Sequence, residues 1–206
     1  MVTTLKVSED DFESAVDVAH ALLHSGGVFV YPTDTVYGIG CDATNENAVE
    51  RIHRIKGIMA RRPMSVMMPD FGMIEYYCDT GLWEDVILKK YLPGPYTFIL
   101  KMHKGRVLPA TNTDRLGIRM PDHPFCQALC AEFGRPIVST SANVTSRLPA
   151  TKLSDIDRSV LDAVDLVIDG GPTKYRSPSV IIDLVERKMM REGASDKISL
   201  IELPGR

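Results

Sequence analysis

The sequence lacks long hydrophobic runs, a strong net charge and paired cysteines, and each absence narrows the class of protein. Its apolar stretches are only a few residues long, far short of the roughly 20 that a helix needs to cross a bilayer. The first residues contain no apolar segment typical of a secretory signal. With a net charge of −3, the chain has no overall field that favours nucleic acid or membranes, so an anion site must arise locally. We expect no membrane partner.

The cysteines also lack the pattern of a metal or redox site. No two of them form a C-x-x-C pair, and none has the spacing of a zinc site. Cys126 and Cys130 lie four residues apart on a predicted helix, on the side that also carries Leu129 and Phe133. We interpret the cysteines as reduced core thiols, which suit a reducing compartment, and we predict a cytoplasmic protein.

What is present is ordinary globular composition. Hydrophobic residues make up 44% of the chain and charged residues 25%, which excludes a disordered chain. A length of 206 residues is enough for one well-buried core. No internal repeat or low-complexity segment divides the sequence, so we expect a single domain over residues 1–206.

Hydrophobic spacing predicts helices that alternate with strands. A helix follows Ser8, an N-cap candidate, and ends at Gly26. Residues 28–31 are continuously apolar, as in a central strand covered on both faces. Further strands are expected at 64–68, 97–102, 116–120, 137–139, 166–168, 180–184 and 198–202, and further helices at 45–56, 83–91, 124–133 and 154–164. This alternation predicts an α/β fold with a mainly parallel or mixed sheet.

Polar residues collect where these strands end, which is where ligands bind in open α/β sheets. Thr33 and Asp34 directly follow the strand at 28–31, and they either contact a ligand or cap the turn. Arg119 lies in an apolar strand, and its planar fork suits either a ligand carboxylate or an acid of the chain itself. Ser141 and Asn143 follow the strand at 137–139, and they either bind a nucleotide or cap a helix.

The loop at 56–63 carries three cations, Lys56, Arg61 and Arg62, together with a glycine. A cationic loop beside a polar cleft is suited to cover a polyphosphate. The alternative is a solvent-exposed basic loop with no ligand. Near the C-terminus, Ser179 precedes one predicted strand and Arg191 follows another, and each is a weak signal alone.

Taken together, these segments resemble the YrdC family, also called the threonylcarbamoyl-AMP synthase family. The resemblance covers roughly residues 15–193. It rests on the segments YPTDTVYG at 31–38, KG at 56–57, PGPYT at 93–97, GIRMPDHP at 117–124, STSAN at 139–143 and DGG at 169–171.

The resemblance implies a twisted mixed sheet with flanking helices and a concave ligand-binding surface. It implies an enzyme that forms threonylcarbamoyl-AMP and pyrophosphate from L-threonine, bicarbonate and ATP, with Mg²⁺ as the expected cofactor. A tRNA threonylcarbamoyl transferase complex is then the expected partner, and direct binding of tRNA or double-stranded RNA is a further expectation.

The resemblance also implies roles for individual residues, none of which is a covalent nucleophile. Catalysis would depend on positioning and charge neutralisation. The residues expected to bind threonine are Thr33, Arg119 and Ser179, and those expected to bind ATP are Lys56, Ser141, Asn143 and Arg191.

The sequence departs from the family pattern at the Lys-x-Arg motif. Ile58 stands where the family has arginine, and Glu192 stands where it usually has proline. A YciO-like branch shares both departures. We expect Arg61 or Arg62 to supply the missing charge, as a possible phosphate lid.

Two function classes therefore stay open. The first is the synthase, and the second is a weakly catalytic or non-catalytic relative that binds RNA or a nucleotide. A dinucleotide-dependent oxidoreductase is excluded, although residues 38–43 fit G-x-G-x-x-A, because no acidic ribose ligand follows at the required distance.

Overall fold

The structure is a computed structural model that describes residues 3–7, 12–57, 62–145 and 147–194. Its helices are α1 (Phe12–His24), α2 (Glu46–Ile55), α3 (Phe71–Tyr77), α4 (Leu82–Tyr91), α5 (Pro124–Phe133), the 3₁₀ helix η1 (Leu153–Asp155) and α6 (Arg158–Leu161). Its strands are β1 (Thr3–Lys6), β2 (Phe29–Tyr31), β3 (Gly38–Gly40), β4 (Val66–Met67), β5 (Tyr96–Lys101), β6 (Arg115–Arg119), β7 (Ile137–Val138), β8 (Thr140–Ser141), β9 (Leu166–Asp169), β10 (Val180–Asp183) and β11 (Lys188–Arg191).

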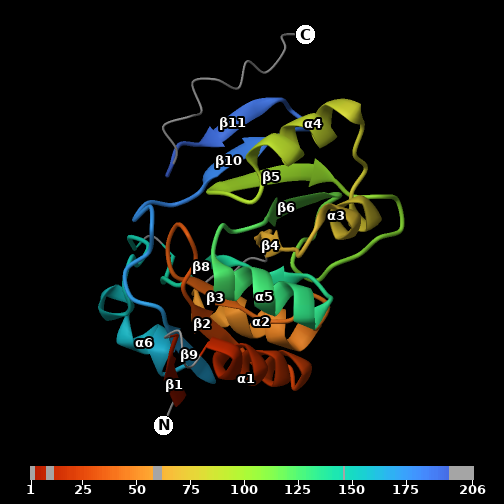
Figure 1. The fold of residues 1–206 in the computed structure, drawn as a ribbon. Coiled ribbons are helices and arrows are strands. Elements are labelled where there is room, and N and C mark those ends of the chain that lie inside the picture. The colour runs from red at the N-terminus through yellow and green to blue at the C-terminus, as the bar shows by residue number, and fades with distance from the viewer. Residues whose placement is uncertain (1–2, 8–11, 58–61, 146, 195–206) are drawn as a thin grey trace.

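The strands form two mixed sheets. One has the order β1-β9-β2-β3-β8, and the other has the order β11-β10-β5-β6-β4-β7. Figure 1 shows the second sheet beneath α4 at one end of the molecule and the first sheet beside α1 and α6 at the other end. The consecutive strands β7 and β8 belong to different sheets, so the segment 137–141 joins the two halves.

Local sequence explains where the helices begin and end. α2 starts at Asn45, whose side chain accepts a hydrogen bond from the Ala48 amide. α5 has Pro124 in its first turn and ends at Gly134, which takes a left-handed conformation with φ 63°. Cys126 and Cys130 are buried free thiols on α5, as predicted.

Two hydrophobic clusters hold these elements together. The smaller joins α1 to α5 and to one face of β2 and β9. The larger contains Val30 and Ile39 from the first sheet and Phe98 and Ile118 from the second, so both sheets share one core. A single domain is expected to have one such core. The assignment of residues 1–206 to one domain stays a prediction. None of the helices in the described ranges combines the length and apolar character needed to span a membrane.

The α/β class and the mixed pairing are confirmed, but several details differ, and neither α3 nor β1 was expected from the sequence. The strands expected from the sequence divide between two sheets instead of forming one. Residues 38–40 form a strand within a glycine-rich segment that the sequence favours as a loop. Glycine is required there because a Cβ at Gly40 would lie 2.6 Å from the Val138 carbonyl oxygen. The helix expected at 154–164 is interrupted at Ile156, which is extended (φ −80°, ψ 132°) and packs into the core. The strand expected at 198–202 lies outside the described residues.

Candidate functional site

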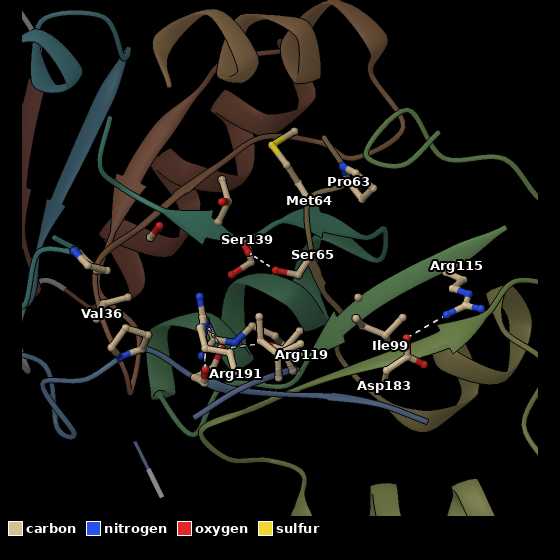
Figure 2. Close-up of a pocket in the computed structure, with 18 of the residues that line it drawn as sticks. Val36, Pro63, Met64, Ser65, Ile99, Arg115, Arg119, Ser139, Asp183 and Arg191 are labelled. Carbon is tan, nitrogen blue, oxygen red and sulfur yellow. Dashed lines mark hydrogen bonds and ion pairs between the residues drawn. The ribbon is translucent and has the colours of Figure 1, made fainter. Parts of the chain in front are cut away.

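A cavity of about 410 Å³ lies between one face of the second sheet and the segment 137–141 that joins the two sheets (Figure 2). Side chains from both ends of the sequence line it, because β10 and β11 lie beside β5 and β6. The lining residues are Val36, Pro63, Met64, Ser65, Thr97, Ile99, Thr113, Arg115, Gly117, Arg119, Ser139, Thr140, Ser141, Pro149, Pro178, Ser179, Ile181, Asp183 and Arg191.

The floor of the cavity follows the two-residue period of its strands. β6 presents Arg115, Gly117 and Arg119 to the cavity, and successive side chains on one face of a strand are two residues apart. Arg115 and Arg119 are therefore about 13 Å apart along the strand. Ile99 of β5, which pairs with Gly117, and Ile181 of β10 make the middle of the floor apolar. The cavity has two polar ends and an apolar centre.

Arg119 is held in place at one end by residues of the turn after β2. Its Nη2 donates hydrogen bonds to Asp34 Oδ1 at 3.1 Å and to Thr35 Oγ1 at 2.8 Å. The Arg119 side chain is 7% exposed and that of Asp34 is fully buried, so the ion pair is largely shielded from water. The structural ion pair considered from the sequence is therefore present. Nε of Arg119 is buried and has no hydrogen-bond partner in the described structure, and the residue lines the cavity.

Thr33 belongs to the same turn, but it is fully buried and does not line the cavity. Its hydroxyl donates to the Val36 carbonyl at 2.7 Å and accepts from the Thr35 amide at 3.1 Å. The Thr33 and Thr35 hydroxyls are also 3.0 Å apart. The turn-capping alternative thus describes Thr33, and Thr35 is the threonine that contacts Arg119. The sequence did not distinguish these two neighbouring hydroxyls.

Arg191 lies beside Arg119 at the same end of the cavity (Figure 2), and it contacts Ser179. Arg191 donates from Nε and Nη2 to the Ser179 carbonyl oxygen at 3.1 and 2.9 Å, and from Nη2 to the Ser179 hydroxyl at 3.2 Å. That hydroxyl also lies 2.8 Å from the Thr97 hydroxyl. Burial lowers the pKa of Arg191, and the charge of Arg119 lowers it further. Two guanidiniums close enough to repel each other favour an anion between them.

Ser141 lines the wall of the cavity, whereas Lys56 and Asn143 do not. Lys56 Nζ instead donates to the backbone carbonyls of Ser141 and, at 3.1 Å, of Asn143. Burial lowers the pKa of Lys56 from 10.5 to about 8. Lys56 thus shapes the Ser141–Asn143 turn from behind, although the sequence predicted direct contact with phosphates.

Asn143 stabilises the loop that follows the same turn. Its Nδ2 donates to the carbonyls of Val144 at 3.0 Å and Arg147 at 2.7 Å. Its Oδ1 is buried and finds no hydrogen-bond partner in the ranges the structure covers. Lys56, Ser141 and Asn143 therefore form one cluster, whereas Arg191 contacts Ser179, and of these four residues only Ser141 and Arg191 line the cavity.

Of the two arginines of the predicted phosphate lid, only Arg62 is among the described residues. Ile58 and Arg61 lie outside the described residues. Arg62 is exposed and lines a separate hollow of about 240 Å³ with His53. The structure therefore does not bring Arg62 to the main cavity.

Two lining residues at the other end were not singled out from the sequence. Arg115 Nη1 donates to Asp183 Oδ2 at 2.9 Å, and its Nη2 donates to Glu186 Oε1 at 2.6 Å. Arg115 could have been found, because it directly precedes the strand predicted at 116–120 and lies four residues before Arg119, so in an extended chain it shares the face of Arg119. Asp183 could not, because its place depends on the pairing of β10 with β5.

The geometry defines an anion-binding cavity on a two-sheet α/β fold, with one end more basic than the other. Arg119 and Arg191 lie at the basic end, and the Arg115–Asp183 ion pair lies at the other. The described residues contain no cluster of three or more His, Cys, Asp or Glu side chains suited to a metal ion.

Comparison with known proteins places this fold in a family. The family model Sua5_yciO_yrdC, described as telomere recombination, matches residues 21–193. A protein of Idiomarina loihiensis named threonylcarbamoyl-AMP synthase is 31% identical over 182 residues, which are 86% of this chain and 97% of the relative. The chain therefore belongs to the Sua5–YciO–YrdC family, as the sequence motifs predicted.

Two solved structures have the same fold. The crystal structure of P. abyssi Sua5 complexed with L-threonine has a TM-score of 0.85 and 27% identity, and the match covers 100% of this chain but 61% of the Sua5 chain. The crystal structure of E. coli YciO has a TM-score of 0.83 and 29% identity, and the match covers 96% of this chain and 97% of YciO. This chain thus spans about three-fifths of that Sua5 and nearly all of YciO.

Proposed function

We propose that this protein is a nucleotidyltransferase that makes threonylcarbamoyl-AMP. In the first step, the amine of L-threonine attacks the carbon of bicarbonate, and water leaves to give a carbamate. In the second step, a carbamate oxygen forms a bond to the α-phosphorus of ATP. The bond from that phosphorus to the bridging oxygen of the β-phosphate breaks, and pyrophosphate leaves.

The observation that carries this proposal is Arg119, which lines the cavity and is held through one nitrogen by the turn after β2. Asp34 and Thr35 bind Nη2 and fix the plane of the guanidinium, while Nε has no partner among the described residues. A planar cationic group held in this way suits the carboxylate of an amino acid. A relative solved with L-threonine has the same fold. Thr33 contributes indirectly, by positioning Thr35.

The hydroxyls beside Arg119 suit the remaining groups of threonine. Ser179 and Thr97 lie 2.8 Å apart on neighbouring strands and line the cavity. Each hydroxyl can donate one hydrogen bond and accept others, so the pair can bind either the ammonium or the hydroxyl of the amino acid. Threonine would then lie with its amine directed toward the centre of the cavity.

The nucleotide would lie along the opposite wall, with its α-phosphate near the basic end. Ser141 offers a hydroxyl on that wall, and Arg191 offers a guanidinium at the basic end in addition to that of Arg119. The charges of Arg119 and Arg191 would stabilise the charge that develops on the phosphate oxygens during the transfer. Lys56 would act through the turn that carries Ser141, and Asn143 Oδ1 is an acceptor beside that turn.

ATP would enter as its magnesium complex, since phosphate oxygens and water can provide most of the Mg²⁺ ligands. Two expectations rest on the resemblance: a tRNA threonylcarbamoyl transferase complex that accepts the product, and direct contact with tRNA or double-stranded RNA. A place in the cytoplasm is an expectation that rests on the buried cysteines. A further expectation, which rests on the cationic loop and on Ile58 at the position of the family arginine, is a phosphate lid at Arg61 or Arg62. Replacing both with alanine should lower the rate if either residue supplies the missing charge, and unchanged turnover would exclude that role.

Pyrophosphate release tests the proposed function. The purified chain with MgATP should release pyrophosphate only when both L-threonine and bicarbonate are present. Arg119→Lys keeps the charge but loses the planar fork, so the KM for threonine should rise about 10- to 100-fold. Arg158→Lys is the matched control, because Arg158 is exposed on α6, pairs with Asp162 and does not line the cavity. Tight ATP binding without any pyrophosphate release would favour the non-catalytic alternative.

A further inference from the structure

The end of the cavity opposite Arg119 contains a fixed carboxylate that the proposed reaction does not use. Asp183 lines the cavity and its side chain is only 5% exposed. Its Oδ2 accepts from Arg115 at 2.9 Å, and its Oδ1 accepts from the Glu186 amide at 2.8 Å. Both contacts hold the carboxylate in one orientation, and Figure 2 shows the contact with Arg115.

This carboxylate retains capacity for a ligand. An ionised carboxylate has about four lone-pair sites, and the described contacts of Asp183 occupy two. Arg115, in contrast, is engaged by two acids, because Glu186 Oε1 lies 2.6 Å from its other terminal nitrogen. The group of Arg115, Asp183 and Glu186 therefore carries a net negative charge and offers acceptors, whereas the opposite end of the cavity offers cations.

The surface between the two ends is flat and apolar. Gly117 has no side chain, and it pairs with Ile99 of β5, which in turn pairs with Asp183 of β10. Ile181, two residues before Asp183 on β10, lines the cavity as well. A Cβ at Gly117 would lie 3.3 Å from Ser65 Cβ and 3.5 Å from Thr97 Cγ2, so little room exists for a larger residue. Met64 and Pro63 line the cavity as well. Such a surface suits an aromatic ring.

We propose that Asp183, held by Arg115, determines the nucleotide specificity of this protein by accepting a hydrogen bond from the exocyclic amino group of adenine. The inference rests on the proposed function, because that function supplies the nucleotide and directs its phosphates to Arg119 and Arg191. The base then lies over Gly117, Ile99 and Ile181, with its amino edge at Asp183. A purine with a carbonyl at the same position meets the carboxylate with an acceptor, and the two groups repel each other.

The test compares ATP with ITP, which replaces this amino group with a carbonyl. Calorimetric titration of the full chain should give a Kd for ITP that is about 10- to 100-fold higher than that for ATP. The amide of Asp183→Asn can donate to a carbonyl as well as accept from an amine. In this variant the Kd values for ITP and ATP should therefore differ by less than about 3-fold. Glu186→Gln is the matched control, because Glu186 contacts Arg115 but does not line the cavity, and it should leave the ratio unchanged.

Binding is the readout because it separates this inference from the proposed function. ATP selectivity that depends on Asp183 would support the inference even if no pyrophosphate were released. A synthase that binds ATP and ITP equally, or whose preference survives in folded Asp183→Asn, would show that Arg115 and Asp183 only join β6 to β10. If Asp183→Asn does not fold, Asp183→Glu retains the charge but displaces the carboxylate by one methylene. Asp183→Glu should lower the ratio of the Kd for ITP to the Kd for ATP at least 3-fold, and an unchanged ratio would overturn the inference.

Discussion

Replacing Lys56 with methionine should change how the stability of the protein depends on pH. Lys56 is 7% exposed, and burial lowers the pKa of its ammonium from 10.5 to about 8. Between these two values the unfolded chain holds a proton that the folded chain has lost. Stability therefore rises with pH in this window, because the fold escapes the cost of burying the charge.

The magnitude follows from the two pKa values. Their difference corresponds to about 3 kcal/mol in the free energy of unfolding, of which about 2 kcal/mol falls between pH 7.5 and 10. Below pH 8 this cost is fully present, and it opposes the hydrogen bonds that the ammonium donates to the carbonyls of Ser141 and Asn143. Such bonds from a charged donor contribute about 1.5–3 kcal/mol each. Lys56→Met should therefore change stability only moderately at neutral pH.

Urea unfolding at a series of pH values provides the assay. The free energy of unfolding of the wild type minus that of Lys56→Met should increase by about 2 kcal/mol from pH 7.5 to 10. Lys89→Met is the matched control, because Lys89 is exposed on α4, and its difference should stay constant. A difference for Lys56→Met that is flat, or that decreases with pH, would refute the description of Lys56 as a buried ammonium held by backbone carbonyls.

Two further substitutions test how the cavity is built. Asp34→Ala leaves Arg119 buried without its acid, so the free energy of unfolding should fall by about 3–5 kcal/mol; a loss below about 1 kcal/mol in urea unfolding would show that the pair is not shielded from water. Gly193→Ala places a Cβ 2.2 Å from the Pro178 carbonyl oxygen, so the backbone between Ser179 and Arg191 must shift. Thermal unfolding should show a loss of about 1–3 kcal/mol and calorimetry a weaker affinity for ATP, and unchanged values for both would contradict the position of Arg191.

The sequence predicts the helices and the buried strands well, because their signals are local. Apolar spacing and cap residues indicate α2 and α5 directly, and Cys126 and Cys130 are buried on α5 as their spacing suggests. The strand β3 was not predicted, because its glycines resemble a loop until the close approach of the Val138 backbone is known. The division into two sheets depends on long-range pairing that no local pattern encodes.

The candidate site follows the same rule. Arg119, Ser141, Ser179 and Arg191 line one cavity, and the resemblance implies binding roles for all four. The sequence could not show that Lys56 binds backbone carbonyls instead of opening into the cavity. That outcome depends on the path of the chain 85 residues later, at Ser141.

Similarly, nothing local separates Thr33 from Thr35. Both hydroxyls follow the same buried strand, and only the position of Arg119 distinguishes them. Thr35 receives the guanidinium, and Thr33 supports Thr35 from beneath.

The most direct test of the proposed chemistry follows two labels into one product. The protein is incubated with L-threonine, ¹⁴C-bicarbonate and ATP labelled at the α-phosphate, and the products are separated. If the cavity joins a threonine carbamate to the adenylyl group, a single compound should carry both labels, and its amount should equal that of the pyrophosphate released. Pyrophosphate release that leaves the carbon label in bicarbonate, or AMP labelled only at phosphorus, would contradict the account.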